Sequence, residues 1–178
     1  LSKFSIHIPR ESLQLSNNPQ MNQNYNTSEF PLNHEIFFPV LTNSKKTKQY
    51  IANGMYQLYA FNQLEACNNF VLAACYDPEC AFAYWGASYS ITMNINHIKI
   101  DKPILQFSIS CFKKAYSLRD HGTTFLVVKL LIEALKSRVI INGLSFDDPQ
   151  NIDPSYSQIE DMMHHYCDRM KNIYNLFP

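Results

Sequence analysis

The chain has 178 residues, 46% of them hydrophobic, so it is long enough to bury a core and short enough to form one domain. Its 15 Lys and Arg side chains balance 15 Asp and Glu, which argues against a field that would draw it onto nucleic acid or an anionic membrane. The sequence has no membrane-length apolar run, and its five cysteines, an odd number, favour free thiols in the cytoplasm over a disulfide framework.

The N-terminal part differs in character from the rest. Residues 1–33 are rich in Asn, Gln and Ser without an apolar period, which predicts a flexible arm. The apolar run His34 to Asn43 contains Pro39 and predicts an extended segment that packs on the first helix.

Beyond Ser44, the apolar residues follow a helical period that is interrupted at regular places. The pattern predicts six helices in three antiparallel pairs, at about 45–60, 63–76, 80–93, 102–118, 123–140 and 154–177. Ser44 and Asp101 are expected to cap the first and fourth helices, and Pro154 or Ser155 is expected to start the sixth.

An internal repeat runs through these helices. A small, an aromatic and a second small residue recur at the same spacing in the second and fourth helices: Ala66, Phe70 and Ala73, then Ser108, Phe112 and Ala115. Pro78 and Asp120 close the two copies, and a fainter third copy contains Tyr166, Met170, Ile173 and Pro178. Tyr50 and Tyr84 correspond in the preceding helices, which implies an insertion at Asn94 to Asp101 in the second copy.

These residues, with Gly54, resemble the pattern of a tetratricopeptide repeat, although Asn53 and Gln57 depart from its usual apolar residues. The FNxxEA, DPxCAxAYWG and NIN segments are similar to those of a group of long proteins with such repeats. The resemblance implies an all-α, right-handed α-solenoid of about three helix-turn-helix pairs within residues 34–178, with units at 47–80, 81–122 and 123–178. We expect it to be a piece of a longer array, because a terminal repeat needs a polar capping face and no solvating helix follows the third unit.

The resemblance also implies function: a non-enzymatic protein–protein interaction scaffold that binds a peptide or protein segment in its concave groove. The residues that the repeat register places along this groove are Lys48, Ile51, Met55, Tyr59, Phe82, Trp85, Tyr89, Lys129 and Glu133. Trp85 and Tyr89 would be the anchors and Lys48 the reader of an acidic group, while Trp85 could equally be a core residue between repeats. Lys129 and Glu133, an i, i+4 pair, could face either the groove or solvent.

The remaining candidate chemistry has a structural alternative in each case. Cys67, Cys75 and Cys80 form no CxxC pair and fit small buried packing residues better than metal ligands. Glu160, His164 and Asp168 share a helix face that could bind a metal, but HExxH is absent and a solvated face fits as well. We therefore expect no enzyme activity, metal, cofactor, nucleic acid or membrane.

Two other interpretations stay open beside the groove. One is a structural module that self-associates through its C-terminal end near Met162, Tyr166 and Met170. The other is a metal-dependent enzyme built on the stripe of Glu160, His164 and Asp168.

Overall fold

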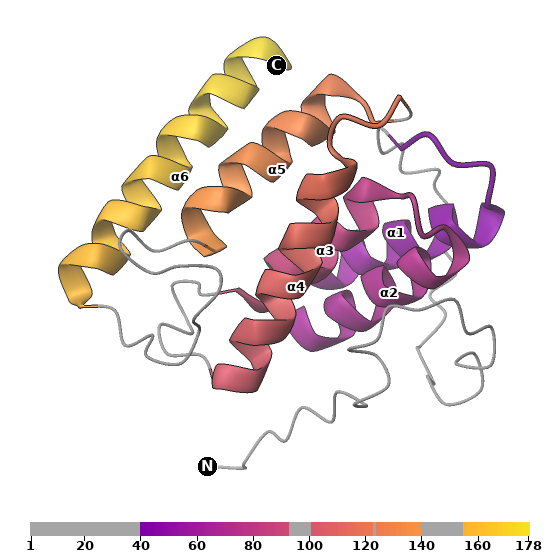
Figure 1. The fold of residues 1–178 in the computed structure, drawn as a ribbon, viewed down its shortest axis with the longest axis horizontal. Helices are drawn as coiled ribbons and strands as arrows, with labels where there is room; N and C mark the ends of the chain where they lie inside the picture. Colours follow the sequence, from indigo (N-terminus) through magenta and orange to yellow (C-terminus); the bar gives the residue numbers. More distant parts are fainter. Residues whose placement is uncertain (1–39, 93–100, 123, 140–154) are drawn as a thin grey trace.

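The structure, a computed structural model, describes residues 40–92, 101–122, 124–139 and 155–178 (Figure 1). These residues form six α-helices and no strand: α1 Lys45–Tyr59, α2 Gln63–Tyr76, α3 Ala81–Ile91, α4 Lys102–Leu118, α5 Leu126–Val139 and α6 Tyr156–Leu176. The six predicted helices are confirmed, each end within three residues of its prediction. The predicted arm, the apolar run up to Pro39 and the predicted insertion before Asp101 lie outside the described residues.

Local capping explains where several helices begin. The Ser44 side chain accepts a hydrogen bond from the Thr47 N–H at 3.1 Å and caps α1. Ser155 forms a capping box with Gln158 at the start of α6, as expected for a helix-initiating serine. Asp101 occupies the cap position of α4, but its side chain makes no capping hydrogen bond.

Helix α3 lies at the centre of the described residues. Each helix packs on the next one along the chain, and α3 also packs on α1 and α5, so four helices surround it. Nine of its eleven residues are therefore buried, and its sequence, AFAYWGASYSI, contains no charged side chain. A helix that is apolar on every side is typical of a core position.

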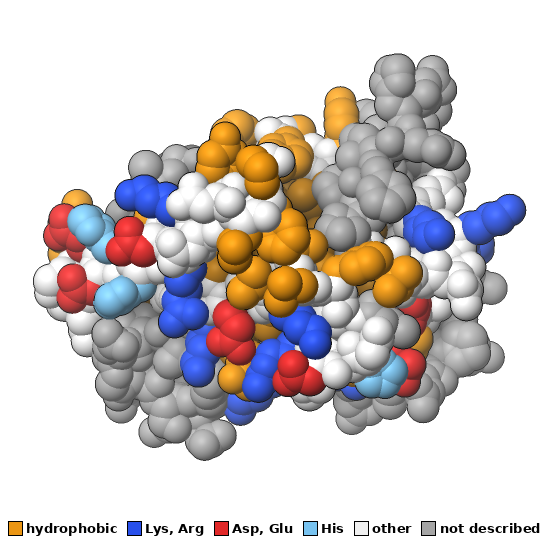
Figure 2. Space-filling view, turned by 90° about the horizontal axis from the view of Figure 1, so that it is seen from above, with side chains coloured by type: hydrophobic (Ala, Val, Ile, Leu, Met, Phe, Trp, Pro, Cys, Tyr) orange, Lys and Arg blue, Asp and Glu red, His pale blue; other side chains and the backbone are white. Residues whose placement is uncertain are grey.

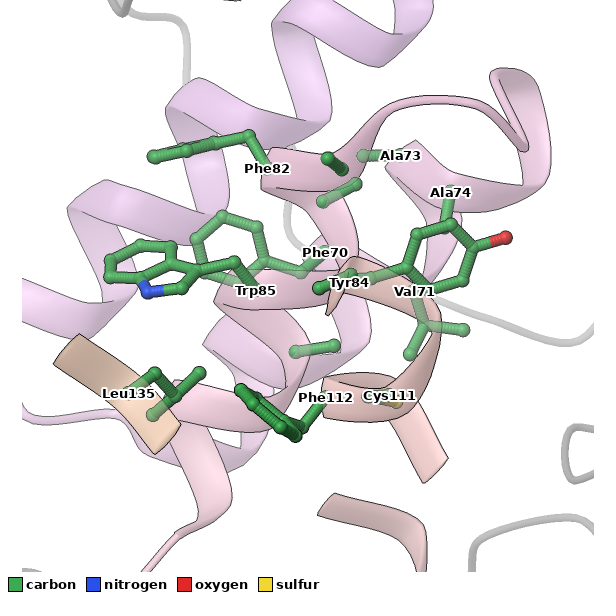
Figure 3. Packing of buried hydrophobic residues seen from close by; sticks show 14 of the residues in the cluster. Phe70, Val71, Ala73, Ala74, Phe82, Tyr84, Trp85, Cys111, Phe112 and Leu135 are labelled. Atoms are coloured by element: carbon green, nitrogen blue, oxygen red, sulfur yellow. The ribbon is translucent and has the colours of Figure 1, made fainter. Parts of the chain in front are cut away.

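The small and aromatic residues of the repeat form the centre of the core. Those on α2 and α4, Ala66, Phe70, Ala73, Ser108, Phe112 and Ala115, are each at most 1% exposed. Phe70 points into the hydrophobic cluster near Phe82 and Trp85 (Figure 3), and its ring lies against the backbones of Gly54 on α1 and Gly86 on α3. Small residues are needed at these positions because the helices approach closely around the ring.

Some large hydrophobic side chains remain on the surface. On the face seen in Figure 2, hydrophobic side chains gather in the middle, with charged side chains beside them. Exposed residues of this class occur on α1 and α2, before and within α5, and at both ends of α6. None of the described helices combines the length and apolar character that a membrane crossing requires.

Candidate functional site

Four residues of the predicted groove lie in the core. Ile51, Met55, Phe82 and Trp85 are 1%, 7%, 4% and 5% exposed, respectively. Phe82 and Trp85 are covered because α3 is central and neighbouring helices pack on the side that the repeat register assigns to the groove. Ile51 and Met55 belong to the same hydrophobic cluster from α1, which packs on α2 and α3. Trp85 is therefore a core residue, which was the second of the two expectations for it.

Trp85 belongs to a stack of rings along α3. Its ring stacks on Phe82 at a centroid distance of 4.9 Å and on Tyr89 at 5.1 Å. The indole N–H donates a hydrogen bond to the Leu131 carbonyl of α5 at 3.1 Å. The stack therefore joins α3 to α5 and uses most of the ring surface that a ligand would need.

Tyr89 extends this stack towards α6. Its ring lies 6.3 Å from that of Tyr166, and the Arg138 guanidinium lies 4.6 Å from the Tyr89 ring centroid and 5.0 Å from that of Tyr166. Burial raises the pKa of Tyr166, and Tyr89 raises it further. Arg138, a residue that sequence reasoning missed, is only 4% exposed, so this cation joins α3, α5 and α6 from inside.

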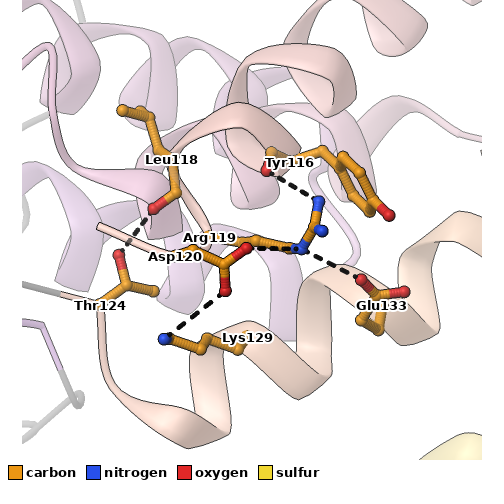
Figure 4. A network of polar contacts seen from close by, with 7 residues as sticks. All are labelled: Tyr116, Leu118, Arg119, Asp120, Thr124, Lys129 and Glu133. Atoms are coloured by element: carbon orange, nitrogen blue, oxygen red, sulfur yellow. Dashed lines mark hydrogen bonds and ion pairs between the residues drawn. The ribbon is translucent and has the colours of Figure 1, made fainter. Parts of the chain in front are cut away.

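Lys129 and Glu133 take part in a polar network between α4 and α5 (Figure 4). Arg119 Nε lies 3.2 Å from Asp120 and 3.4 Å from Glu133, and Lys129 Nζ lies 3.7 Å from the other Asp120 oxygen. The Arg119 guanidinium also stacks 3.6 Å from the Tyr116 ring centroid. Lys129 and Glu133 therefore each form an ion pair with a residue outside α5. The i, i+4 spacing, by contrast, predicts that they pair with one another.

The other two predicted groove residues, Lys48 and Tyr59, are exposed on α1. Lys45 and Tyr56 are also exposed. These two residues share one side of the helix with Lys48 and Tyr59, because the spacings among the four are three residues, four residues or sums of the two. Together with Phe61, they are called the α1 surface below. Tyr56, Tyr59 and Phe61 expose 43%, 76% and 78% of their areas, so the fold buries little of the last two rings.

Phe61 has an unusual backbone conformation. Its φ of 59° places it in the left-handed region, and it is the only described residue other than glycine with a positive φ. The Asn62 N–H donates to the Gln57 carbonyl at 2.9 Å and the Phe61 N–H to the Leu58 carbonyl at 3.2 Å. This is a Schellman motif, whose left-handed position is usually glycine, so sequence patterns alone do not reveal Phe61.

Gln57 and Asn53, the two residues that depart from the usual repeat pattern, lie in different environments. Gln57 is 3% exposed, and its side-chain oxygen accepts a hydrogen bond from the Asn62 amide at 3.0 Å, which supports the same motif. Asn53 is 1% exposed, and neither its side-chain oxygen nor its side-chain nitrogen has a hydrogen-bond partner among the described residues.

The cysteines divide into buried and exposed thiols. Cys67, Cys80 and Cys111 are buried, and burial raises the pKa of Cys67 to about 12 and that of Cys80 to about 11. The expectation that Cys75 is buried was wrong: Cys75 is exposed in the last turn of α2. Three buried thiols with raised pKa values suit packing rather than nucleophilic or redox chemistry.

The stripe of Glu160, His164 and Asp168 is exposed along α6. Among the described residues, no three His, Cys, Asp or Glu side chains lie close enough together to hold a metal ion. Asp168 instead lies 3.9 Å from Lys171 of the same helix.

Exposed cations and aromatic rings therefore lie together on one side of α1. Tyrosine side chains in particular are common anchors at protein interfaces. No known protein family, curated protein or solved structure matches the chain.

Proposed function

We propose that this chain is a non-enzymatic protein–protein interaction module that binds a peptide or a segment of another protein. The observation that carries the proposal is the α1 surface, where Tyr59 and Phe61 are 76% and 78% exposed. Burying an aromatic ring at an interface is favourable because it removes a large apolar area from water. In the isolated chain, the rings of Tyr59 and Phe61 gain little of this favourable burial energy.

We also propose that the helices form a right-handed solenoid like that of tetratricopeptide repeats. The contacts among helices support this arrangement: α1, α3 and α5 follow one another in contact, while α2 also packs on α3 and α4 on α5. Arrays of helix pairs pack each unit against its neighbours in this way. The equivalent burial of Phe70 and Phe112 supports it further. The five free thiols support a reducing compartment such as the cytoplasm.

A quantitative pull-down from native lysate tests the proposed function. We would compare the unaltered full chain with the double variant Lys48→Glu, Tyr59→Ala, and with Tyr174→Ala as a control that removes an exposed tyrosine, 70% exposed, from α6. Circular dichroism verifies that helix content is equal. We expect a partner that is retained by Tyr174→Ala and depleted at least tenfold by the double variant. Equal recovery by all three proteins would refute binding through α1.

A second candidate is self-assembly through α6. Tyr156, Tyr174 and Leu176 are 76%, 70% and 63% exposed on this helix. Two antiparallel copies of α6 would also bring Asp161, near the start of the helix, close to Lys171 of the other copy, near its end. Light scattering after size exclusion, over a range of concentrations, tests this candidate. A monomer mass throughout, unchanged by Tyr174→Glu, would exclude it over that range.

A further inference from the structure

We infer that the partner of the α1 surface is a peptide segment with acidic side chains at one end and an apolar side chain at the other. This inference rests on the proposed function and adds the chemistry and the orientation of the ligand. It follows from two groups of residues at opposite ends of α1, neither of which is explained by the stability of the fold.

The first group is the lysines at the start of α1. Lys45 and Lys48 are exposed and form no ion pair with the described residues, whereas the Lys46 ammonium donates a hydrogen bond to the Tyr76 hydroxyl at 3.1 Å. The first turn of α1 contains no acidic residue. Cations at a helix N-terminus are disfavoured by the helix dipole, so these lysines do not stabilise the helix. Carboxylates of a partner, placed beside Lys45 and Lys48, would make the electrostatic energy at this end of the helix favourable.

The second group is the pair of rings at the other end. A bulky residue in the left-handed conformation is strained, and glycine at Phe61 would relieve that strain. A buried ring could offset the strain through packing, but Phe61 is 78% exposed and Tyr59 is 76% exposed. Packing of the Phe61 ring within the described residues therefore does not offset the strain, and a partner's apolar side chain would supply that packing.

The distance between the two groups limits the size of the ligand. Lys48 and Tyr59 are eleven residues apart on α1, or about 16 Å at the helical rise. An extended peptide covers that distance with about five residues. The segment should therefore place its acidic cluster about five residues from an aromatic or aliphatic residue, with the acids at the N-terminal end of α1. The formal net charge of zero favours such a local contact over a long polyanion or an anionic bilayer.

Peptide display on the full chain tests the inference. Random 12-residue peptides would be selected on the unaltered protein, and the enriched sequences would be synthesised with a fluorescein label. Their affinities would be measured by anisotropy for the unaltered protein, Phe61→Gly, Lys48→Glu and the control Tyr174→Ala. Phe61→Gly relieves backbone strain, so a loss of binding in this variant cannot be attributed to unfolding.

We expect the selected peptides to combine an acidic cluster with an apolar residue about five positions away. Their affinity should fall at least tenfold for Phe61→Gly and for Lys48→Glu, with a weaker effect of Lys48→Glu at high salt, and should be unchanged for Tyr174→Ala. Selected peptides without acidic residues, or peptides that bind Phe61→Gly equally well, would overturn the inference and leave the proposed function standing. Failure to select any peptide would count against both. Binding to phosphatidylserine vesicles or to a 20-nucleotide DNA, lost in the same two variants, would replace the peptide by that ligand.

Discussion

Gly86→Ala should destabilise the chain, because α3 meets the Phe70 ring at this glycine. A Cβ at Gly86 would lie 2.4 Å from the Cδ1 and Cε1 atoms of Phe70, about 1 Å or more inside an ordinary contact. The ring has little room to retreat, because on its other side it already lies close to the backbone of Gly54, where even an added Cβ would be 3.1 Å from three ring atoms. It also meets Phe82 edge-on at a centroid distance of 6.4 Å, and it is fully buried.

The size of the effect follows from two opposing contributions. Overpacking of this severity costs about 3 kcal/mol, the upper end of its usual range. Replacing glycine by alanine within a helix returns about 1 kcal/mol. The expected net loss is therefore about 2 kcal/mol. Gly54→Ala, with its milder contacts, should lose less, and Gly122→Ala should lose nothing because, apart from the glycine and its chain neighbours, no described residue has an atom within 4 Å of its added Cβ.

Urea unfolding, followed by circular dichroism and by the fluorescence of Trp85, measures these differences in the free energy of unfolding. Trp85 is the one tryptophan of the chain and is 5% exposed, so it reports on this part of the core. In the Phe70→Leu background, which provides space, the effect of Gly86→Ala should shrink by about 1 kcal/mol or more. If Gly86→Ala is as stable as Gly122→Ala, or if its effect is the same in both backgrounds, the packing argument is refuted.

Three further results are expected. Phe61→Gly should raise the free energy of unfolding by about 1 kcal/mol because it removes left-handed strain, and an unchanged urea midpoint would contradict the conformation of the turn. In native protein, a chromogenic disulfide reagent should react with the exposed Cys75 and Cys167 but not with Cys67 or Cys111 until the chain unfolds; four or more fast thiols would contradict the burial pattern. The buried thiols should leave stability unchanged below pH 9, and each should lower it by about 1.4 kcal/mol per pH unit above pH 9 until its folded pKa is reached, about 11 for Cys80 and about 12 for Cys67. The sign follows because burial raises the pKa of Cys67 from 9.0 to about 12, so unfolded chains lose the proton first. Urea midpoints that stay level between pH 8 and 11 would contradict this.

The helices could be predicted because the signals that start and stop them are local. The Ser44 and Ser155 side chains cap helices by accepting hydrogen bonds from backbone N–H groups three residues away, and Pro78 lies in a break between α2 and α3. The residues of the proposed binding surface could be predicted only in part. Lys48 and Tyr59 are exposed as a groove would require, whereas Phe61 was missed, because glycine is the usual mark of a left-handed helix end.

By itself, the sequence determined six helices and the small and aromatic residues that let them approach closely, because capping and periodicity depend on neighbours a few residues away. Tertiary structure alone decided which faces are covered. Trp85 and Tyr59 both occupy predicted groove positions, yet Trp85 is 5% exposed within α3 and Tyr59 is 76% exposed at the end of α1. Four helices surround α3, and none of them can be inferred from the spacing of residues within α3 itself. Burial depends on segments that are distant in the sequence and come together in the fold. For this reason, the packing of the helices decided which residues lie in the core and which lie on the candidate binding surface.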